Sequence, residues 1–465
     1  MSVPYWVQDA VFYQIFPDRF ANGDPKNDPP NVQAWGSPPT TSNFMGGDLR
    51  GIINHFDYLL DLGINCIYLN PIFHSPSNHR YNTSDYYKID PKLGDMRDFK
   101  ALLENAHQNN IRVILDGVFN HCGRGFFAFV DVLENQQDSA YKDWYHIKQF
   151  PVEAYTPGEA TDYLAWWKIK SLPKFNTDNQ QVRKYILDVA RYWIAQGADG
   201  WRLDVPNEID DDGFWGEFRQ AVKEVNPDAY LVGEIWDQEP RWVGDDHFDG
   251  LMNYPVRKAL LDVLTSSSAD MSQFASNIES NLRVYKRENT FAMFVPMGSH
   301  DTERLLTILE GDIGKAKLAF LFQFAFPGAP AIYYGDEIGM MGGKDPGCRG
   351  SFPWDRNQWD TELHAWLKQL IVMRKRLPVL RRGNYQQILV DNRRRFFAFA
   401  RTLGDSAVLV LLNLGATRRH VRIKVDSLGW EDGRILHSLL EQEELIVSGD
   451  SATVTIPPWS GKWFT

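Results

Sequence analysis

Eight short apolar runs alternate with helical patterns along most of the chain. The runs are almost continuously hydrophobic, which is typical of strands that are buried on both faces. They cover Ala10 to Phe16, Ile64 to Phe73, Arg112 to Phe119, Gly200 to Val205, Tyr230 to Ile235, Phe248 to Met252, Phe291 to Met297 and Ala329 to Tyr334. Between them, apolar residues recur at helical spacing over residues 99–106 and 182–193. Strands and helices in this alternation predict an α/β fold, the TIM (β/α)₈ barrel.

One connection in this pattern is too long to be a simple loop. No barrel element is predicted between residues 121 and 177, a segment rich in Tyr, Trp, Phe and Lys. A structureless loop of this length is improbable in a compact domain, so we expect a small inserted domain here. The insertion follows the third strand and leaves the barrel at the rim where barrel enzymes keep their chemistry.

The sequence pattern changes from helical to strand-like near the end of the chain. Pro378 ends the last helical pattern. Short strand-like runs follow, separated by turns such as Leu403-Gly404-Asp405; they cover Phe396 to Arg401, Ala407 to Leu412, His420 to Val425, Ser451 to Ile456 and Trp459 to Phe464. We therefore expect the barrel over residues 1–120 and 178–380, and an antiparallel β-sandwich over residues 381–465.

Composition narrows the classes of function. The chain has 465 residues, 43% hydrophobic and 23% charged, which is ordinary for a soluble enzyme. Its net charge of −11 argues against a nucleic-acid partner or an anionic membrane. The most apolar stretch, Leu318 to Phe326, contains Gln323 and is too short to span a membrane.

The chain start and the cysteines indicate a cytoplasmic protein. The first residues lack the basic and apolar regions of a secretory signal. Cys66, Cys122 and Cys348 are few, odd in number and far apart, which fits a reducing compartment. A Cys122–Cys348 disulfide is the less favoured alternative.

Three acidic residues stand where apolar runs end. Asp204, Glu234 and Asp301 come from distant parts of the chain. Carboxylates at the ends of buried strands are costly unless they are paired or used. Three of them on one rim suggest a site that handles positive charge developing on a sugar ring. The alternative for each one alone is an ordinary surface or paired acid.

The neighbours of two of these acids indicate different roles. Arg202 and Asp204 lie two apart on one strand and share a face, so the guanidinium should keep Asp204 ionised. An ionised carboxylate is what a nucleophile requires. Glu234 has Val232 and Trp236 as same-face neighbours, and apolar surroundings favour the protonated form that a general acid needs.

Five motifs resemble those of the α-amylase family of retaining glycoside hydrolases, and they occur in the family's order. They are Asp116-Gly-Val-Phe-Asn-His121, Leu172-Pro-Lys-Phe-Asn176, Gly200-Trp-Arg-Leu-Asp-Val205, Gly233-Glu-Ile235 and Ser299-His-Asp301. The resemblance covers the chain essentially end to end. The Leu172–Asn176 motif and Val205-Pro-Asn-Glu208 place it nearest the branch of cyclomaltodextrinases, neopullulanases and maltogenic amylases.

The resemblance implies a role for each matching residue. Asp204 would be the nucleophile, Glu234 the acid/base, and Asp301 would bind sugar hydroxyls, while Asp116 looks structural. The residues implied in substrate binding are Tyr81, His121, Arg202, Asn207, Glu208, His300, Asp345 and Arg349. Tyr81 and Asp345 as plain loop residues remain an alternative. A zinc site at His121 and His300 is disfavoured because no third ligand stands at a typical spacing.

A polar turn near the start of the chain predicts a calcium site. Oxygen donors crowded into a Gly/Pro turn suit Ca²⁺, and relatives of this branch bind calcium at matching positions. The matching residues are Asn22, Asp24, Asn27, Asp28, Gly46 and Asp48. The alternative is a turn capped by its own Asn and Asp side chains.

The resemblance implies an intracellular hydrolase of α-glucans: maltooligosaccharides, cyclodextrins or pullulan. It implies α-1,4 cleavage, but Pro206 replaces the alanine usual in the branch, which leaves α-1,6 linkages open. The first strand begins about ten residues into the chain, so we expect the branch's N-terminal β-domain to be absent and leave the oligomeric state open. Trp166 and Trp167 could form a sugar platform or pack in the inserted domain's core.

Two competing hypotheses remain at this point. The first is an α-1,6-glucosidase or an α-glucan transglycosylase on the same fold. The second is a non-catalytic, carbohydrate-binding or transport protein, which the presence of Asp204, Glu234 and Asp301 disfavours. Fold alone would not decide between them, because function depends on the site.

Overall fold

The computed structural model describes residues 2–465 and places all eight predicted runs in one parallel sheet. The strands are β1 (Phe12–Ile15), β2 (Cys66–Leu69), β5 (Arg112–Gly117), β6 (Gly200–Leu203), β7 (Tyr230–Gly233), β8 (Gly250–Leu251), β9 (Phe294–Pro296) and β10 (Ala329–Tyr333). Their order is β8-β7-β6-β5-β2-β1-β10-β9, and a parallel bridge between Met252 and Phe294 joins the two ends. The sheet is closed, so the predicted TIM barrel is confirmed.

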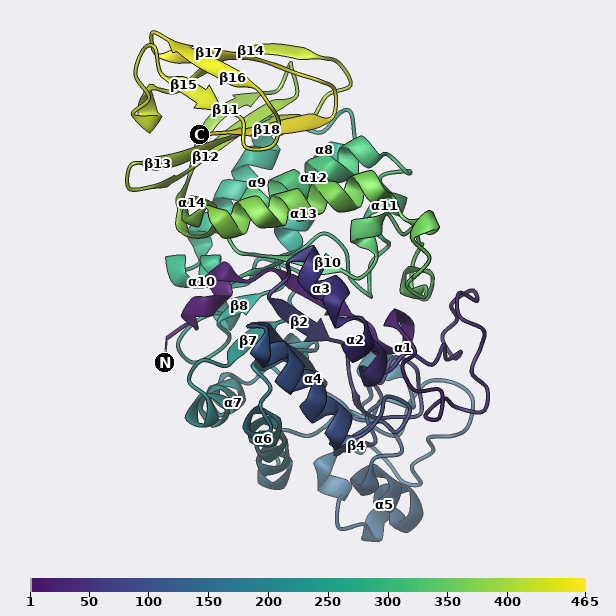
Figure 1. The fold of residues 1–465 in the computed structure, drawn as a ribbon. Helices are drawn as coiled ribbons and strands as arrows, with labels where there is room; N and C mark the ends of the chain where they lie inside the picture. The colour runs from purple at the N-terminus through teal and green to yellow at the C-terminus, as the bar shows by residue number, and fades with distance from the viewer. Residues whose placement is uncertain (1) are drawn as a thin grey trace.

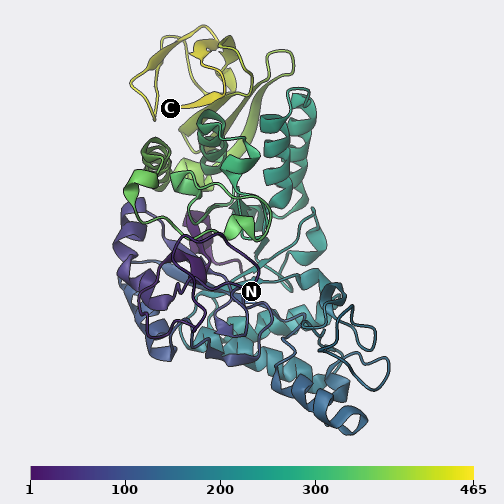
Figure 2. The ribbon, with the colours of Figure 1, turned by 90° about the vertical axis from the view of Figure 1, so that its right-hand side faces the viewer.

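Helices surround this barrel (Figures 1 and 2). The longer ones are α4 (Met96–Gln108), α6 (Gln180–Ala195), α7 (Asp212–Val225), α8 (Tyr254–Thr265), α9 (Met271–Val284), α12 (Ile313–Ala325) and α13 (Thr361–Arg376). The shorter ones are α1 (Pro17–Phe20), α2 (Leu49–Asn54), α3 (Phe56–Leu62), α10 (Arg287–Phe291), α11 (Leu305–Ile308) and α14 (Pro378–Arg382). Both helical patterns found in the sequence are confirmed. A capping box between Asp95 and Asp98 fixes the start of α4, and the Asn179 side chain caps α6.

The inward-facing positions of the strands change from apolar to polar toward the carboxyl ends. Successive residues of a strand point to opposite faces, so positions two apart share the barrel interior. The inner series runs from Phe12 to Gln14, from Tyr68 to Asn70, from Ile114 to Asp116 and from Val232 to Glu234. The first member of each pair belongs to one buried apolar cluster that fills the base of the barrel. The second members place a layer of buried polar groups on top of it.

One predicted strand is split in the structure. The run from Ile64 to Phe73 was expected to be a single strand, but β2 ends at Leu69. The residues after it form β3 (Phe73–His74), which pairs with β4 (Asp85–Ile89) in a separate hairpin. Pro71 lies between the two and has no backbone N–H to donate to a ladder, so the barrel strand cannot continue through it.

The segment between β5 and α6 packs as a small unit at the end of the molecule opposite the C-terminal sheets (Figure 1). It contains α5 (Phe127–Asn135) and is otherwise held by isolated bridges, such as Tyr145 with Phe175. A bridge between His121 and Lys174 closes its base. Two of the motifs found in the sequence therefore meet where this segment joins the barrel.

The C-terminal residues form two four-stranded sheets, so the predicted β-sandwich is confirmed. One sheet has the order β11-β12-β13-β18 and the other β14-β17-β16-β15. Their strands are β11 (Asn384–Asp391), β12 (Phe396–Leu403), β13 (Ser406–Asn413), β14 (Arg419–Lys424), β15 (Ile435–His437), β16 (Glu444–Ser448), β17 (Ser451–Ile456) and β18 (Ser460–Phe464). The sequence missed β11, β15 and β16. Strand β11 is polar at its start and contains no fully buried residue, so no alternation marks it.

Two buried arginines donate to backbone carbonyls near the junction of the barrel and the sandwich. Arg374 of α13 donates to the carbonyl oxygens of Phe324, Gly328 and Leu380 at 2.5–3.2 Å, all within the barrel part of the chain. Arg401 of β12 donates to the carbonyl oxygens of Gly383 and of Ala325 in α12 at 2.5–3.1 Å, and so joins the sandwich to the barrel. Burial lowers the pKa of Arg374 to about 9, which shows how far this cation is removed from water.

No helix within residues 2–465 combines the length and the apolar character needed to cross a membrane. Cys66, Cys122 and Cys348 are buried and free. The Cys122–Cys348 disulfide considered from the sequence is therefore not formed.

We predict that Arg374→Met destabilises the protein by about 3 kcal/mol, because it leaves several buried carbonyls without a donor. Chemical denaturation followed by tryptophan fluorescence measures the change. Arg376→Met is the matched control, since this arginine is exposed on the same helix and should cost well under about 0.5 kcal/mol. Equal effects of the two substitutions would contradict the role of Arg374.

Candidate active site

One guanidinium group joins three carboxyl groups at the carboxyl ends of β5, β6 and β7. Arg202 Nη1 lies 2.9 Å from Asp116 Oδ1 and 3.1 Å from Asp204 Oδ1. Arg202 Nη2 lies 2.9 Å from Glu234 Oε1. All four residues are buried. A planar cation with donors in a fixed fork is well suited to hold several carboxylates in one geometry.

This arrangement fixes how far apart Asp204 and Glu234 can be. Asp204 Oδ1 accepts a hydrogen bond from Arg202 Nη1 at 3.1 Å, and Glu234 Oε1 forms an ion pair with Nη2 of the same guanidinium at 2.9 Å. Two oxygens held in this way lie within roughly 8 Å of each other. The arrangement is compatible with the separation of about 5–5.5 Å between the two carboxyl groups of a retaining glycosidase.

A strained residue orients the second oxygen of Glu234. The backbone N–H of Val205 donates to Glu234 Oε2 at 3.1 Å. Val205 has φ 36° and ψ 51°, in the left-handed region. A β-branched residue there is a genuine outlier, and strain of this kind persists only where its surroundings impose it. The turn after Asp204 therefore positions both Glu234 and the nucleophile candidate.

Burial controls the protonation of the two paired carboxyls. It raises the pKa of Glu234 to about 7, against the attraction of Arg202 and with added repulsion from Asp301. The direction agrees with the sequence prediction for a general acid. Burial also raises the pKa of Asp204 well above its ordinary value, despite the attraction of Arg202. Repulsion from Glu234 and Asp116 adds to this rise, and the expectation that Arg202 keeps Asp204 ionised stays a prediction.

A hydrogen-bond chain sets the tautomer of His300. Gln14 Nε2 can only donate, and it lies 2.9 Å from His300 Nδ1, so Nδ1 is the acceptor. The proton of His300 is then on Nε2, which faces the hydroxyl of Tyr81 at 2.5 Å and Asp301 Oδ2 at 3.1 Å. Burial lowers the pKa of His300 well below its ordinary value, so the ring is neutral. The site thus has a fixed N–H donor beside Asp301.

Tyr81 belongs to the same layer, so the plain-loop alternative does not describe it. Its hydroxyl donates to Asp116 Oδ2 at 2.7 Å. Its ring lies parallel to His300, with centroids 5.4 Å apart and planes 3° apart. The Tyr81 ring is therefore held in a fixed orientation, half-buried at the edge of the cluster.

Asp301 and Asp345 are linked through Arg349. Arg349 Nη2 lies 3.3 Å from Asp301 Oδ1, and its Nη1 lies 3.1 Å from Asp345 Oδ1. The side chain of Asp301 is 30% exposed and that of Asp345 is 42% exposed. The cluster is thus buried at Arg202 and opens toward solvent at Asp301 and Asp345.

His121 lies where the barrel joins the inserted segment. Its Nε2 atom is buried and has no hydrogen-bond partner within residues 2–465. Its ring stacks on Trp166, and Trp166 stacks on Trp167 with centroids 4.3 Å apart. Trp167 is 77% exposed, so core packing, one of the two alternatives from the sequence, does not apply to it.

Asn207 and Glu208 do not contact the cluster directly. Both are exposed on the 3-10 turn Pro206–Glu208 that follows Asp204. Lys174 donates to the carbonyl oxygen of Glu208 at 2.6 Å. The inserted segment and the turn after Asp204 are therefore tied together beside the open side of the site.

The candidate calcium turn folds around the carboxylate of Asp48. This carboxylate accepts from the backbone of Gly23, Asp24 and Gly51 and from the side chain of Asn27, at 2.6–3.1 Å. Asn22 Nδ2 donates to Asp28 Oδ1 at 2.9 Å. The Oδ1 atoms of Asn22 and Asn27 are buried without a partner among the described residues. No group of three or more His, Cys, Asp or Glu in residues 2–465 has a metal-binding arrangement, so any cation here would depend on amide and backbone oxygens.

Comparison with known proteins identifies the family to which the chain belongs. The family model "Alpha amylase, catalytic domain" matches residues 14–382, and "Maltogenic Amylase, C-terminal domain" matches residues 385–463. The chain belongs to the α-amylase family. It is a glycosidase of that family, acting on α-glucans.

Relatives within the α-amylase family match almost the full chain. A cyclomaltodextrinase of Geobacillus thermopakistaniensis is 46% identical over 98% of this chain and 77% of its own length. The intracellular maltogenic amylase of Bacillus subtilis is 42% identical over 91% of this chain and 71% of its own. The cyclic α-maltosyl-(1→6)-maltose hydrolase of Arthrobacter globiformis, solved with that cyclic sugar, is 40% identical with a TM-score of 0.91, and the match covers 100% of both chains.

Several residues of this α-amylase family site were not found from the sequence. Asp116, expected to be structural, accepts hydrogen bonds from Arg202, from Tyr81 and from the Tyr68 hydroxyl, the last at 2.5 Å. Gln14 was not among the predicted residues, although it sets the tautomer of His300. The inner-face series described above, with a polar residue two positions after an apolar one, is the sequence signal that could have identified Gln14 and Asn70.

We predict that the stability of Glu234→Gln relative to the parent increases as the pH rises. The pKa of Glu234 rises from 4.5 to about 7 on folding, so its contribution to stability is complete below 4.5 and is lost as the pH rises through 7. Glutamine keeps the shape without that loss. The melting temperature of the variant relative to the parent should therefore rise between pH 4.5 and pH 7 and level off above it. Exposed Glu104→Gln is the control, and a pH-independent difference for Glu234→Gln would contradict the raised pKa.

Proposed function

We propose that the protein is a retaining glycoside hydrolase that cleaves α-1,4 bonds of maltooligosaccharides, cyclodextrins or pullulan through a covalent glycosyl-enzyme. The observation that carries this proposal is the sharing of Arg202 by Asp204 and Glu234. Two carboxyl groups this close together can act on opposite sides of one anomeric carbon. Asp204 is the nucleophile and Glu234 is the general acid and base.

The contacts of Glu234 assign its proton in the first step. Oε1 faces the Arg202 cation, so the proton resides on Oε2. Oε2 transfers this proton to the glycosidic oxygen while Asp204 attacks the anomeric carbon. Asp204 Oδ1 is held by Arg202, and Oδ2 has no hydrogen bond within the described residues, so Oδ2 is the attacking atom. The sugar–oxygen bond breaks as the bond to Asp204 forms.

The same contacts support the second step. Once ionised, Glu234 is stabilised by Arg202 and by the N–H of Val205. It then takes a proton from water, which attacks the anomeric carbon and releases Asp204. Asp301 and the Nε2–H of His300 lie where they can bind sugar hydroxyls on the open side of the cluster. A sugar hydroxyl in place of water would give transglycosylation.

A second candidate activity is cleavage of α-1,6 bonds. The relative from Arthrobacter globiformis, whose whole chain matches this one, is named for a substrate that contains a (1→6) linkage, so this linkage belongs in the test. Pro206, Asn207 and Glu208 form the turn that directly follows Asp204, and the family resemblance implies that this turn faces the leaving sugar. The similarity to a cyclomaltodextrinase supports cyclic α-1,4 substrates for this chain instead.

Product analysis on maltotriose, β-cyclodextrin, panose and pullulan tests this function. We expect cleavage of the α-1,4 substrates, with a rate that falls as the pH rises through about 7, because Glu234 must be protonated to act as the acid. Glu234→Gln should lower kcat by at least about a thousandfold. Products from the α-1,6 bond of panose alone would favour the second candidate instead.

A matched variant shows whether the lost activity of Glu234→Gln comes from the missing acid or from a general effect of a Glu→Gln substitution. Glu224→Gln is the control because Glu224 is exposed on α7 and has no part in the site around Arg202. It should retain hydrolysis within about tenfold of the parent. A folded parent that cleaves none of the four glucans, or a fully active Glu234→Gln, would contradict the proposal.

We further propose that the turn at residues 22–28 holds a structural Ca²⁺. The donor set consists of oxygens, as Ca²⁺ prefers, and the unpartnered Oδ1 atoms of Asn22 and Asn27 are free to bind it. At Gly46 an added Cβ would lie 2.3 Å from Asp28 Oδ1, so only glycine allows this backbone to approach the turn. Asp24, Asp28 and Asp48 supply the negative charge. The ion would brace the turn without taking part in the reaction.

We predict that chelation with EDTA lowers the melting temperature by several degrees and that added Ca²⁺ restores it, because the ion binds only the folded state. Asn22→Ala should remove this response. Asn31→Ala, an exposed residue of the same loop, should retain it. A melting temperature unaffected by EDTA and by Ca²⁺ would mean that the turn is capped by its own side chains.

We propose a cytoplasmic location for the protein. The three buried free cysteines are compatible with a reducing compartment, and the relative from Bacillus subtilis is named as intracellular.

A further inference from the structure

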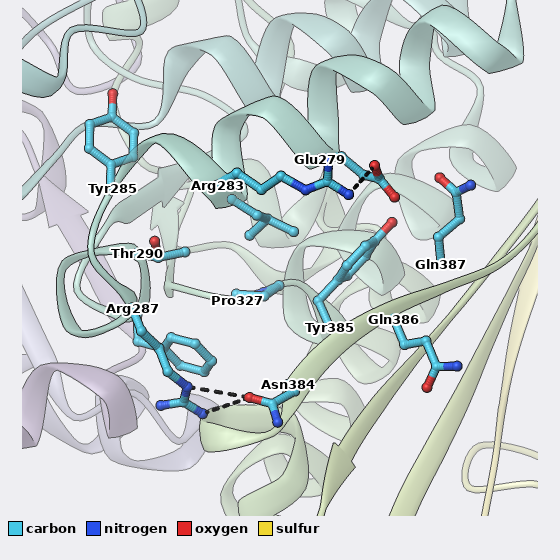
Figure 3. Close-up of a pocket in the computed structure, with 12 residues that line it drawn as sticks. Glu279, Arg283, Tyr285, Arg287, Thr290, Pro327, Asn384, Tyr385, Gln386 and Gln387 are labelled. Carbon is cyan, nitrogen blue, oxygen red and sulfur yellow. Dashed lines mark hydrogen bonds and ion pairs between the residues drawn. The ribbon is translucent and has the colours of Figure 1, made fainter. Parts of the chain in front are cut away.

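A cavity of about 520 Å³ lies between the barrel and the C-terminal sandwich (Figure 3). It is bounded by α9, by the segment 285–291 that leads into α10, and by the first residues of β11. None of the residues around Arg202 lines it. The mechanism proposed above makes no use of this cavity.

An aromatic ring with an unused hydroxyl forms one wall. One face of Tyr385 packs on Phe399, with ring centroids 5.2 Å apart and an angle of 28° between the planes. The ring also lines the cavity. The Tyr385 hydroxyl is buried and has no hydrogen-bond partner in residues 2–465. In Figure 3 it points to the side where Glu279 and Gln387 lie. A buried hydroxyl without a partner is costly unless a bound group satisfies it.

The rest of the lining offers amide groups and nearly balanced charge. Gln386 and Gln387 present side-chain amides, which can both donate and accept. Arg283 is paired with Glu279 at 2.9 Å. Arg287 donates to the amide oxygen of Asn384 at 3.2 and 3.3 Å. The exposed lining is more apolar than polar. An aromatic face with amides around it suits a neutral, hydroxyl-rich ligand better than an anion.

The cavity continues into a second one, which gives room for an extended ligand. A neighbouring hollow of about 390 Å³ shares Glu279 and Arg283 with the first. It adds Gln238 and Ser280, which bond to each other at 3.1 Å, and Ser276. The two hollows lie next to each other along α9 and share the Glu279–Arg283 pair, so together they extend further than one sugar ring requires.

We propose that the two hollows form a secondary binding site for a neutral α-linked glucose chain, with Tyr385 as its stacking platform. The proposal rests on the function proposed above, because it assumes that the enzyme meets long α-glucans. A second site on the same polymer raises the local concentration of substrate at the active site without any new catalytic contact. Short substrates cannot reach both sites, so only long chains would gain.

Affinity electrophoresis in gels that contain amylopectin tests the proposal directly. All proteins carry Glu234→Gln, so that the polymer stays intact and the active site is the same in each. We expect the parent to be retarded and Tyr385→Ala combined with Gln386→Ala to lose most of this retardation, with an affinity about tenfold weaker. Gln108→Ala, an exposed glutamine on α4, is the matched control and should behave as the parent does. Tyr385→Phe keeps the packing on Phe399 and should show a smaller loss, which guards against misfolding of the double variant.

Kinetics of the same substitutions in the active enzyme complete the test. The double variant should raise KM for amylopectin about tenfold and leave kcat/KM for maltotriose unchanged. A parent that is not retarded, a retardation unaffected by the substitutions, or an equal loss on maltotriose would overturn the secondary site. Failure of the parent to cleave maltotriose would instead overturn the proposed function, so the two failures are distinguishable.

Discussion

The arrangement of the site depends on one shared cation. Arg202 is buried at the carboxyl end of β6 and forms ion pairs with Asp116, Asp204 and Glu234. A buried guanidinium requires negative partners, and three buried carboxyl groups require a cation, so neither can be removed without leaving the other exposed to a large desolvation cost. Asp204 and Glu234 are close together because they pair with the same guanidinium group. Burial, with repulsion from neighbouring acids, raises the pKa of both carboxyl groups despite the attraction of Arg202.

The barrel holds the groups around Arg202 in place because inward-facing and outward-facing positions alternate along its strands. The inner positions of β1, β2, β5 and β7 are apolar at the base and polar two residues later. The apolar layer holds the strands in place. The polar side chains two residues later must therefore point into the barrel. Gln14 is an example, because its amide determines which nitrogen of His300 carries the proton. The orientation of groups at the rim is thus determined by residues deep in the barrel.

Much of the fold and part of the site could be predicted from the sequence. The barrel strands are continuous apolar runs, and Asp204, Glu234 and Asp301 stand at the ends of three of them. Those features are local and can be read directly. The sharing of Arg202, the left-handed conformation of Val205 and the central place of Asp116 arise only when the barrel closes. Strand β11 was not predicted because none of its residues is fully buried, so no apolar alternation marks it. Its first residues line the cavity beside α9, a contact that forms only when the two domains pack together.

The central claim is that Asp204 and Glu234 act on opposite sides of one anomeric carbon. Proton NMR of the first product formed from maltotriose, recorded before mutarotation, tests this claim most directly. Net retention, seen as the α-anomer appearing first, is the predicted result, because Asp204 attacks the anomeric carbon and water then displaces it from the same side as the leaving group. Initial release of the β-anomer would contradict it, because inversion requires a water molecule between carboxyl groups that stand about 6.5–9.5 Å apart.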